Sequence, residues 1–253
     1  MNIDWEAKEY AAKFNFVPQY GKGVMELITA PAGSCVLDLG CGNGTLTRQL
    51  ADEGFKVRGM DASPELINLA RTTYPDLDFD EGDATDFHLQ NKVDVIFSNA
   101  VFHWIDRDKQ PLLIHCIADS LVENGELVCE FGGYGNNARI HYALQTEFAK
   151  NGLSYRMPFY FPTIGEYAPL LEQEGLQVRF ATLFDRMTEL KGEDGLADWI
   201  KMFVKTPFTG MDSSLKDHII HKTVQSLKQT LYQEGKWYAD YVRLRIRAVK
   251  TRC

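Results

Sequence analysis

The chain has 253 residues, a length typical of one or two globular domains. Hydrophobic residues make up 45% of it and charged residues 25%, which excludes disordered and fibrous proteins. No run approaches the roughly 18 apolar residues of a membrane-spanning helix, and the N-terminal residues lack the pattern of a signal peptide. The formal net charge of -8 disfavours binding to nucleic-acid backbones. We therefore expect neither a nucleic acid nor a membrane as partner.

The five cysteines do not follow a pattern typical of disulfides or of a zinc site. Their number is odd and they contain no Cys-x-x-Cys pair. We therefore expect free thiols in a cytoplasmic protein. The six histidines are also scattered, and the one pair at helical contact spacing, His218 and His221, has no acidic or thiol partner nearby in the sequence. No metal site is predicted.

Apolar periodicity predicts two helices in the first 30 residues and a strand–helix alternation after residue 34. The predicted elements of this alternation are strand 35–39, helix 45–53, strand 56–60, a helix from Ser63 to before Pro75, strand 77–80, strand 93–98, helix 108–122 and strand 126–131. Strand–helix–strand units at this spacing predict an α/β fold with a doubly wound, mostly parallel sheet.

The alternation changes after Phe131. Glycines and asparagines at 132–137 predict a loop, a helix-like stretch follows to about Lys150, and aromatic and proline residues crowd 155–162. The later predicted elements are strand 177–186, helix 195–204, helix 213–232 and strand 237–249. This half is therefore expected to complete the sheet and to add a helical cap.

A glycine-rich turn follows the first predicted strand. Gly40, Gly42 and Gly44 form a G-x-G-x-G pattern, whereas dinucleotide-binding proteins carry G-x-G-x-x-G. Such a turn brings the backbone close to a ligand at the carboxyl edge of a parallel sheet. Together with Cys41 and Asn43, these glycines form the candidate cofactor loop.

Two acidic residues beside this loop indicate a cationic nucleoside. At the end of the first strand, the Asp38 carboxylate would repel a diphosphate but attract an ammonium or sulfonium group, by about 4 kcal/mol at roughly 4 Å and an effective dielectric near 20. Asp61, followed by Ala62, lies 21 residues after Gly40 at the end of the second strand. A carboxylate there can accept hydrogen bonds from both ribose hydroxyls. These features predict S-adenosylmethionine as the cofactor.

Polar residues also follow the third and fourth predicted strands. The Asp83 carboxylate is placed to accept a hydrogen bond from an adenine amino group, and the backbone N–H of Ala84 to serve a ring nitrogen. The alternative is that Asp83 stabilises a turn. The backbone at Asn99 and Ala100 is expected to line the methionine part of the cofactor.

His103 and Trp104 come directly after these residues. We predict that they contact the substrate, because they follow the strand end that lines the methionine group. The alternative is a His–Trp pair that packs beneath a loop.

These residues and their spacing resemble the class I S-adenosylmethionine-dependent methyltransferases. The matching segments are Val-Leu-Asp-Leu-Gly-Cys-Gly-Asn-Gly-Thr at 36–45, Met-Asp-Ala-Ser at 60–63, Gly-Asp-Ala at 82–84 and Ser-Asn-Ala at 98–100. A second similarity runs over the whole chain, at 16–21, 102–104, 197–200 and 237–249. In these segments the chain resembles the trans-aconitate methyltransferase group, whose members O-methylate small carboxylic acids.

The resemblance implies one domain over residues 1–253, with a seven-stranded sheet in the order 3-2-1-4-5-7-6 whose last strand is antiparallel. Residues 34–131 would form the cofactor-binding half, and residues 132–253 the substrate-side half with cap elements and the final strands. Residues 1–31 would form a helical lid, in which Tyr20 is a candidate cofactor contact, with Tyr10 and Phe16 as further lid residues.

The resemblance also implies methyl transfer to a small-molecule acceptor, with a carboxylic acid as one candidate. A carboxylate is ionised at neutral pH and needs no general base, but a cation or several hydrogen-bond donors in the cap would be needed to bind it. Arg139 and Arg156 are the predicted substrate contacts, and the other arginines of this half are Arg179, Arg186, Arg243 and Arg245.

Several alternatives remain open at this stage. A hydroxyl or amine acceptor would usually require a general base, which no motif identifies. A nicotinamide-dependent oxidoreductase would use a similar sheet. A protein that binds the cofactor without catalysis, as a partner or sensor, would keep the same cofactor motifs. The oligomeric state is not predicted.

Overall fold

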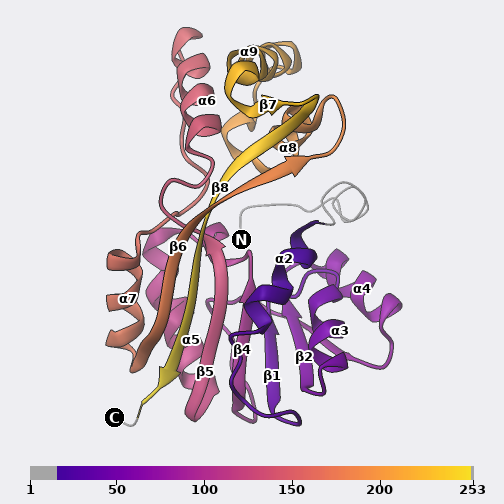
Figure 1. Ribbon diagram of the computed structural model, residues 1–253, viewed down its shortest axis with the longest axis vertical. Coiled ribbons are helices and arrows are strands. Elements are labelled where there is room, and N and C mark those ends of the chain that lie inside the picture. Colours follow the sequence, from indigo (N-terminus) through magenta and orange to yellow (C-terminus); the bar gives the residue numbers. More distant parts are fainter. Residues whose placement is uncertain (1–15, 252–253) are drawn as a thin grey trace.

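The structure is a computed structural model that describes residues 16–251 (Figure 1). Its strands are β1 (Cys35–Leu39), β2 (Lys56–Asp61), β3 (Asp78–Glu81), β4 (Val93–Asn99), β5 (Leu121–Gly132), β6 (Leu176–Leu190), β7 (Tyr232–Gln233) and β8 (Lys236–Lys250). Its helices are α2 (Phe16–Met25), α3 (Thr45–Asp52), α4 (Pro64–Thr73), α5 (Gln110–Ser120), α6 (Ala138–Lys150), α7 (Ile164–Gln173), α8 (Gly195–Phe203) and α9 (Ser213–Leu231). None of these helices is long and apolar enough to cross a membrane.

The strands form one sheet in the order β3-β2-β1-β4-β5-β8-β6. The first five are parallel to one another, whereas β8 is antiparallel to both of its neighbours, β5 and β6. The predicted seven-strand order with an antiparallel last strand is therefore confirmed. The two-residue strand β7 adds a short hairpin to β8.

Helices cover both faces of the sheet. On one face, Val24 of α2 and Leu50 of α3 pack with apolar side chains of β1, β4 and β5. On the other face, α5 and α7 pack through Leu113 and Tyr167 against a larger apolar core. Because helices cover both faces, a ligand can approach the sheet where its strands begin and end.

The cap is built on two strands of the sheet. β6 and β8 each have 15 residues and remain paired beyond the sheet, as far as Leu190 opposite Trp237. Their outer halves carry α6, α8 and α9, at the top of Figure 1. Phe148, Trp199 and Ile219 from these helices form a second apolar core. The predicted helical cap is thus present.

Some boundaries differ from the sequence predictions. α7 was not predicted, although Thr163 and Glu166 form the capping box that marks its start. β5 begins at Leu121, five residues before the predicted 126, because the chain enters the sheet before the turn at Asn124. Of the two helices predicted in the first 30 residues, the second corresponds to α2, and the first lies outside the residues that the structure describes.

A buried carboxylate attaches the segment after α2 to the sheet. One oxygen of Glu126 accepts the N–H groups of Thr29 and Ala30 at 2.7 and 3.0 Å. The other oxygen accepts the Arg247 Nε–H at 2.6 Å. Hydrogen bonds to a charged group are stronger than neutral ones, so this carboxylate fixes the position of the chain between α2 and β1.

We expect Glu126→Gln to lower the free energy of unfolding by about 3 kcal/mol, because Arg247 loses its ionic partner in a buried site. Guanidinium unfolding measures the change, and Glu172→Gln on the exposed face of α7 is the control. Equal losses in the two variants would contradict this role of Glu126.

Candidate functional site

The glycine loop (residues 40–44) joins β1 to α3 at the carboxyl edge of the sheet. Gly40, Gly42 and Gly44 all have positive φ, at 79°, 56° and 80°, a conformation that favours glycine. A Cβ on Gly40 would collide with Val101, and one on Gly44 would lie 2.7 Å from Phe79. A Cβ on Gly42 would meet no atom within 4 Å. The loop is therefore packed at both ends and open at its centre, where a ligand can approach the backbone.

Asp61 connects the end of β2 to this loop. Its carboxylate accepts the N–H groups of Gly42 and Ser63, both at 2.9 Å. Burial raises the pKa of this carboxyl group. A carboxylate has about four acceptor positions, so Asp61 retains capacity for hydroxyl donors of a ligand beside Gly42.

Asp38 is a second buried carboxylate on the same side of the loop. It is 1% exposed and accepts a hydrogen bond from the Thr47 hydroxyl at 2.7 Å. Burial, and to a smaller degree the charge of Asp61, raises its pKa to about 7. Neither carboxylate forms an ion pair with a basic side chain within residues 16–251. A cationic ligand at this edge would supply the missing positive charge.

Cys41 and Asn43 contribute to the loop in different ways. Burial and the two nearby carboxylates raise the pKa of the Cys41 thiol, so it remains protonated. Asn43 Oδ1 accepts the Thr45 N–H at 3.3 Å and the Thr45 hydroxyl at 2.8 Å, which stabilises the start of α3. Both side chains support the backbone that faces the ligand.

Asp83 and Ala84 lie just beyond the end of β3. Asp83 Oδ1 accepts both the N–H and the hydroxyl of Thr85 at 2.8 Å, and these bonds lower the pKa of the carboxyl group. Ala84 is buried in the apolar core. The alternative role of Asp83 in a turn is therefore present, and its contact with adenine stays a prediction.

The end of β4 turns sharply at the predicted methionine position. Ala100 has a φ of 65°, and its N–H donates to the carbonyl oxygen of Glu130 at 2.7 Å. The buried Asn99 Oδ1 has no hydrogen-bond partner in the described part of the chain. An unpaired buried amide oxygen at this edge is available to a ligand donor.

His103 follows β4 in the chain and lies beside the end of β5 at the same edge. Its Nδ1 accepts the Gly132 N–H at 3.2 Å. Burial, together with the charge of Arg243, holds the pKa of His103 well below its usual value. The ring is therefore neutral and carries its proton on Nε2. The neighbouring Trp104 ring packs edge-on against Phe159 at 4.7 Å between centroids.

The other predicted contacts are less clearly placed. Arg139 and Arg156 are exposed, and the backbone N–H of Arg139 donates to Asp240. Tyr20 belongs to α2, but the position of its side chain is outside what the structure describes, as are Tyr10 and the side chain of Phe16. The roles of these residues stay predictions.

The structure brings together three arginines that sequence reasoning did not distinguish from the others. Glu130, with a fully buried side chain, forms ion pairs with Arg186 at 2.9 Å, Arg243 at 3.2 Å and Arg245 at 2.6 Å. The guanidinium groups hold the pKa of Glu130 below its usual value despite burial. One carboxylate therefore faces three cations. This arginine cluster adjoins the carboxyl end of β4, because Glu130 pairs with Asn99 in the sheet register.

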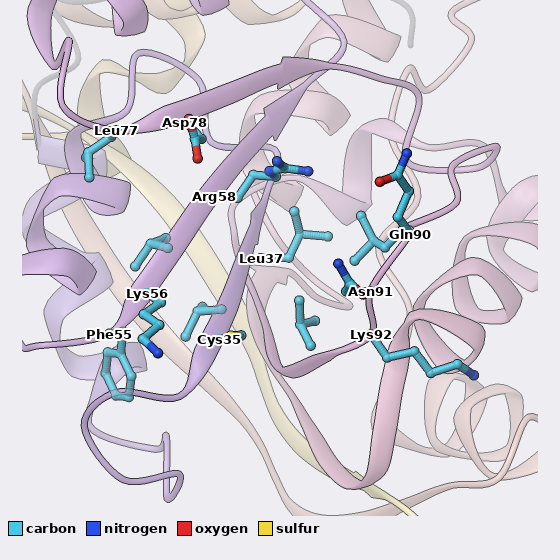
Figure 2. Close-up of a pocket in the computed structure, with 14 residues that line it drawn as sticks. Cys35, Leu37, Phe55, Lys56, Arg58, Leu77, Asp78, Gln90, Asn91 and Lys92 are labelled. Carbon is cyan, nitrogen blue, oxygen red and sulfur yellow. The ribbon is translucent and has the colours of Figure 1, made fainter.

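A pocket of about 450 Å³ lies at the opposite, amino end of β1 and β2 (Figure 2). Arg58, Asn91 and Leu37 are among its lining residues. It borders residues 82–92, which connect β3 to β4 without a helix. Ligands of parallel sheets bind at the carboxyl ends of the strands, so this pocket is separate from the site at the glycine loop.

Comparison with known proteins identifies the family. Residues 36–125 match a family model described as a methyltransferase domain. Over 259 residues, the chain is 31% identical to an uncharacterised methyltransferase of Schizosaccharomyces pombe, covering 97% of this chain and 98% of the relative. The chain belongs to the S-adenosylmethionine-dependent methyltransferases. The predicted enzyme class and cofactor are confirmed.

One further relative and one solved structure extend the comparison. This methyltransferase is 28% identical over 206 residues to trans-aconitate 2-methyltransferase of Enterobacter sp., covering 79% of this chain and 78% of the relative. Its fold is similar to that of Haemonchus contortus phosphoethanolamine N-methyltransferase 2, solved with S-adenosylhomocysteine. That match has a TM-score of 0.58 at 15% identity and covers 92% of this chain and 53% of the other.

The site fits the cofactor of this family. S-adenosylmethionine carries a sulfonium and an ammonium group, and Asp38 and Asp61 are buried without a basic partner in the described residues. The open centre of the loop at Gly42 allows the cofactor to approach the backbone.

We expect Asp38→Asn to stabilise the cofactor-free protein. Asp38 binds its proton more tightly in the folded chain, where the pKa is about 7, than in the unfolded chain, where it is about 3.9. The folded state therefore loses stability as the pH rises between these values. At about pH 8 the variant should be more stable by about 1 to 2 kcal/mol, and near about pH 4 the difference should disappear. Urea unfolding at both pH values tests this, and identical pH profiles would contradict it.

Proposed function

We propose that this methyltransferase transfers the methyl group of S-adenosylmethionine to a carboxylate oxygen of a small acid. The observation that carries the acceptor part of the proposal is the arginine cluster, in which one buried carboxylate faces three guanidinium groups. Guanidinium groups bind carboxylates with charge-assisted hydrogen bonds. The similarity to trans-aconitate 2-methyltransferase supports the same acceptor chemistry.

In this proposal, residues 34–131 hold the cofactor. Asp38 attracts its cationic methionine part, Asp61 accepts hydrogen bonds from the ribose, and Asp83 accepts one from the adenine. The proposed cofactor contacts are Asp38, Gly40, Cys41, Gly42, Asn43, Asp61, Ala62, Asp83, Ala84, Asn99, Ala100 and Tyr20. Residues 1–31 act as a lid, and residues 132–253 supply the acceptor side, all within one domain.

The residues on the acceptor side bind and orient the acid. Arg243 and Arg186 hold one carboxylate oxygen, and His103 donates its Nε2–H to the acceptor. The carboxylate is ionised at neutral pH, so its other oxygen can attack the methyl carbon without a general base. When bound, S-adenosylmethionine supplies an electrophilic methyl carbon with a neutral thioether as leaving group. Alignment of the two reactants in a site without water can lower the activation barrier by about 7 to 11 kcal/mol.

Asp61→Asn tests the proposed cofactor contact. Removing the charge weakens the hydrogen bonds from the ribose, each of which contributes about 1.5 to 3 kcal/mol when it is charge-assisted. Calorimetry should show at least tenfold weaker binding of S-adenosylmethionine. Asp86→Asn, an exposed carboxylate beyond β3, is the control, and an unchanged affinity of Asp61→Asn would disprove this placement of the ribose.

Release of S-adenosylhomocysteine across a panel of acceptors tests the proposed reaction. The panel contains trans-aconitate and other small acids, together with hydroxyl and amine compounds. We expect product from acids only. Preference for a hydroxyl or amine compound would favour the alternative acceptor chemistry. Cofactor binding without any product would favour a non-catalytic partner or sensor.

Arg243→Gln tests the arginine cluster with the best acid of that panel. Loss of a buried charge-assisted contact should raise KM for the acid about a hundredfold, while the affinity for S-adenosylmethionine stays the same. Arg179→Gln, which removes an exposed arginine from β6, should change neither value. Equal effects of the two substitutions would exclude the cluster from acceptor binding.

A further inference from the structure

A second buried histidine lies close to the proposed acceptor site. His141 of α6 and His103 lie beside the same two rings, Phe159 and Phe161. The centroid distances are 5.5 and 6.1 Å from His141, and 6.0 and 5.9 Å from His103. The two phenylalanine rings stack on each other at 5.3 Å with an interplanar angle of 18°. The two histidines therefore lie beside the same stacked pair of rings.

The segment that carries these rings is attached to the carboxyl edge of the sheet. This aromatic loop (residues 151–163) connects α6 to α7. The N–H of Tyr160 donates to the carbonyl oxygen of His103 at 3.1 Å, and that of Tyr134 to the carbonyl oxygen of Pro162 at 2.8 Å. Phe159 and Phe161 are half-buried, so an acceptor held at His103 can contact the exposed parts of these rings.

Tyr155 of the aromatic loop determines the proton position on His141. The Tyr155 hydroxyl lies 2.7 Å from Nδ1 of His141. Burial raises the pKa of this phenol, so it keeps its proton, and its contact with His141 is the one hydrogen bond of this hydroxyl within residues 16–251. The phenol therefore donates to Nδ1. Burial lowers the pKa of His141 to about 3, so the ring is neutral and its own proton lies on Nε2.

His141 Nε2–H is a donor without an acceptor. The atom is buried, and no residue in the described part of the chain forms a hydrogen bond with it. An unsatisfied buried donor is costly in the free protein and binds a ligand oxygen well. The group it selects must be an acceptor of hydrogen bonds, because the Nδ1 side is already occupied by the phenol.

The surroundings of the two histidines differ in charge. Arg243 contributes to the low pKa of His103, whereas no charged group contributes to that of His141. The rings around His141 are those of Tyr155, Phe159, Phe161 and Trp199. A carboxylate buried there would have no cation beside it, which is unfavourable. An uncharged oxygen fits this end of the site.

We propose that His141, positioned by Tyr155, determines specificity by donating Nε2–H to an uncharged carbonyl oxygen on the body of the acid acceptor. This inference rests on the proposed carboxylate methylation. The carboxylate of the acceptor lies at the arginine cluster, its flat apolar body contacts Phe159 and Phe161, and the carbonyl oxygen reaches His141. The acceptor class is a small oxo acid rather than an acid with a second charge.

Two pairs of acids of matched shape test this. They are 4-oxopentanoate with 4-methylpentanoate, and 4-acetylbenzoate with 4-isopropylbenzoate; terephthalate adds a second charge. The wild-type protein should prefer the oxo member of the better pair by about tenfold or more in kcat/KM, because a site built for a hydrogen bond rejects the analogue that lacks it. The preference should lie mainly in KM.

Variants of His141 and Tyr155 test whether the preference for the oxo acid depends on His141. His141→Phe keeps a ring but removes the donor, so the ratio within each pair should fall to about one. His141→Gln restores an N–H at the position of Nε2 and should recover part of the preference. Tyr155→Phe removes the hydroxyl that keeps the proton of His141 on Nε2 and should reduce the preference. Tyr167→Phe, which removes a buried hydroxyl in α7, should not. Unchanged affinity for S-adenosylmethionine shows that each variant is folded.

The outcomes separate this inference from the proposed function. If the acids are methylated but the matched pairs react equally, or if His141→Phe keeps the preference, the role of His141 is wrong and the proposed function stands. Preference for terephthalate would likewise overturn the uncharged oxygen. If no acid in either panel is methylated, the proposed function and this inference both fail.

Discussion

The candidate cofactor site depends on one hydrogen bond, from the N–H of Gly42 to the carboxylate of Asp61. It joins the loop after β1 to the end of β2 and so holds these two strand ends together. Asp61 is buried, and so is Asp38. The two carboxylates therefore lie at one edge of the sheet without a basic partner in the described chain. The site is therefore less stable when empty than when it holds a cation.

The order of the strands separates charge along the carboxyl edge. Asp38 and Asp61 lie on the neighbouring strands β1 and β2, and the arginine cluster lies on β5, β8 and β6. β4 stands between the two groups and ends at Asn99. A cationic methyl donor would bind beside the two aspartates, and an anionic methyl acceptor would bind beside the arginine cluster. Their reacting atoms would then meet near the end of β4.

Local sequence signals predicted the strands and helices of residues 34–131 well. The glycine spacing and the positions of Asp38 and Asp61 are short-range patterns, and the helix start at Ser63 is one too. The arginine cluster depends instead on the register that sets Glu130 opposite Arg245, 115 positions later in the chain. No local pattern reports such a register, so the sequence ranked the exposed Arg139 and Arg156 above it. α7 was overlooked although its capping box is local.

The continuous strand β8 serves both parts of the molecule. Alternate residues of β8 face opposite sides, so Arg243, Arg245 and Arg247 share one face, while Leu244, Ile246 and Ala248 enter the apolar core. A one-residue shift in the register of β8 would exchange the two sets and turn these guanidinium groups toward the apolar core. The register of β8 therefore couples the cap to the arginine cluster, so a change of length is expected to be tolerated in the loops and not within this strand.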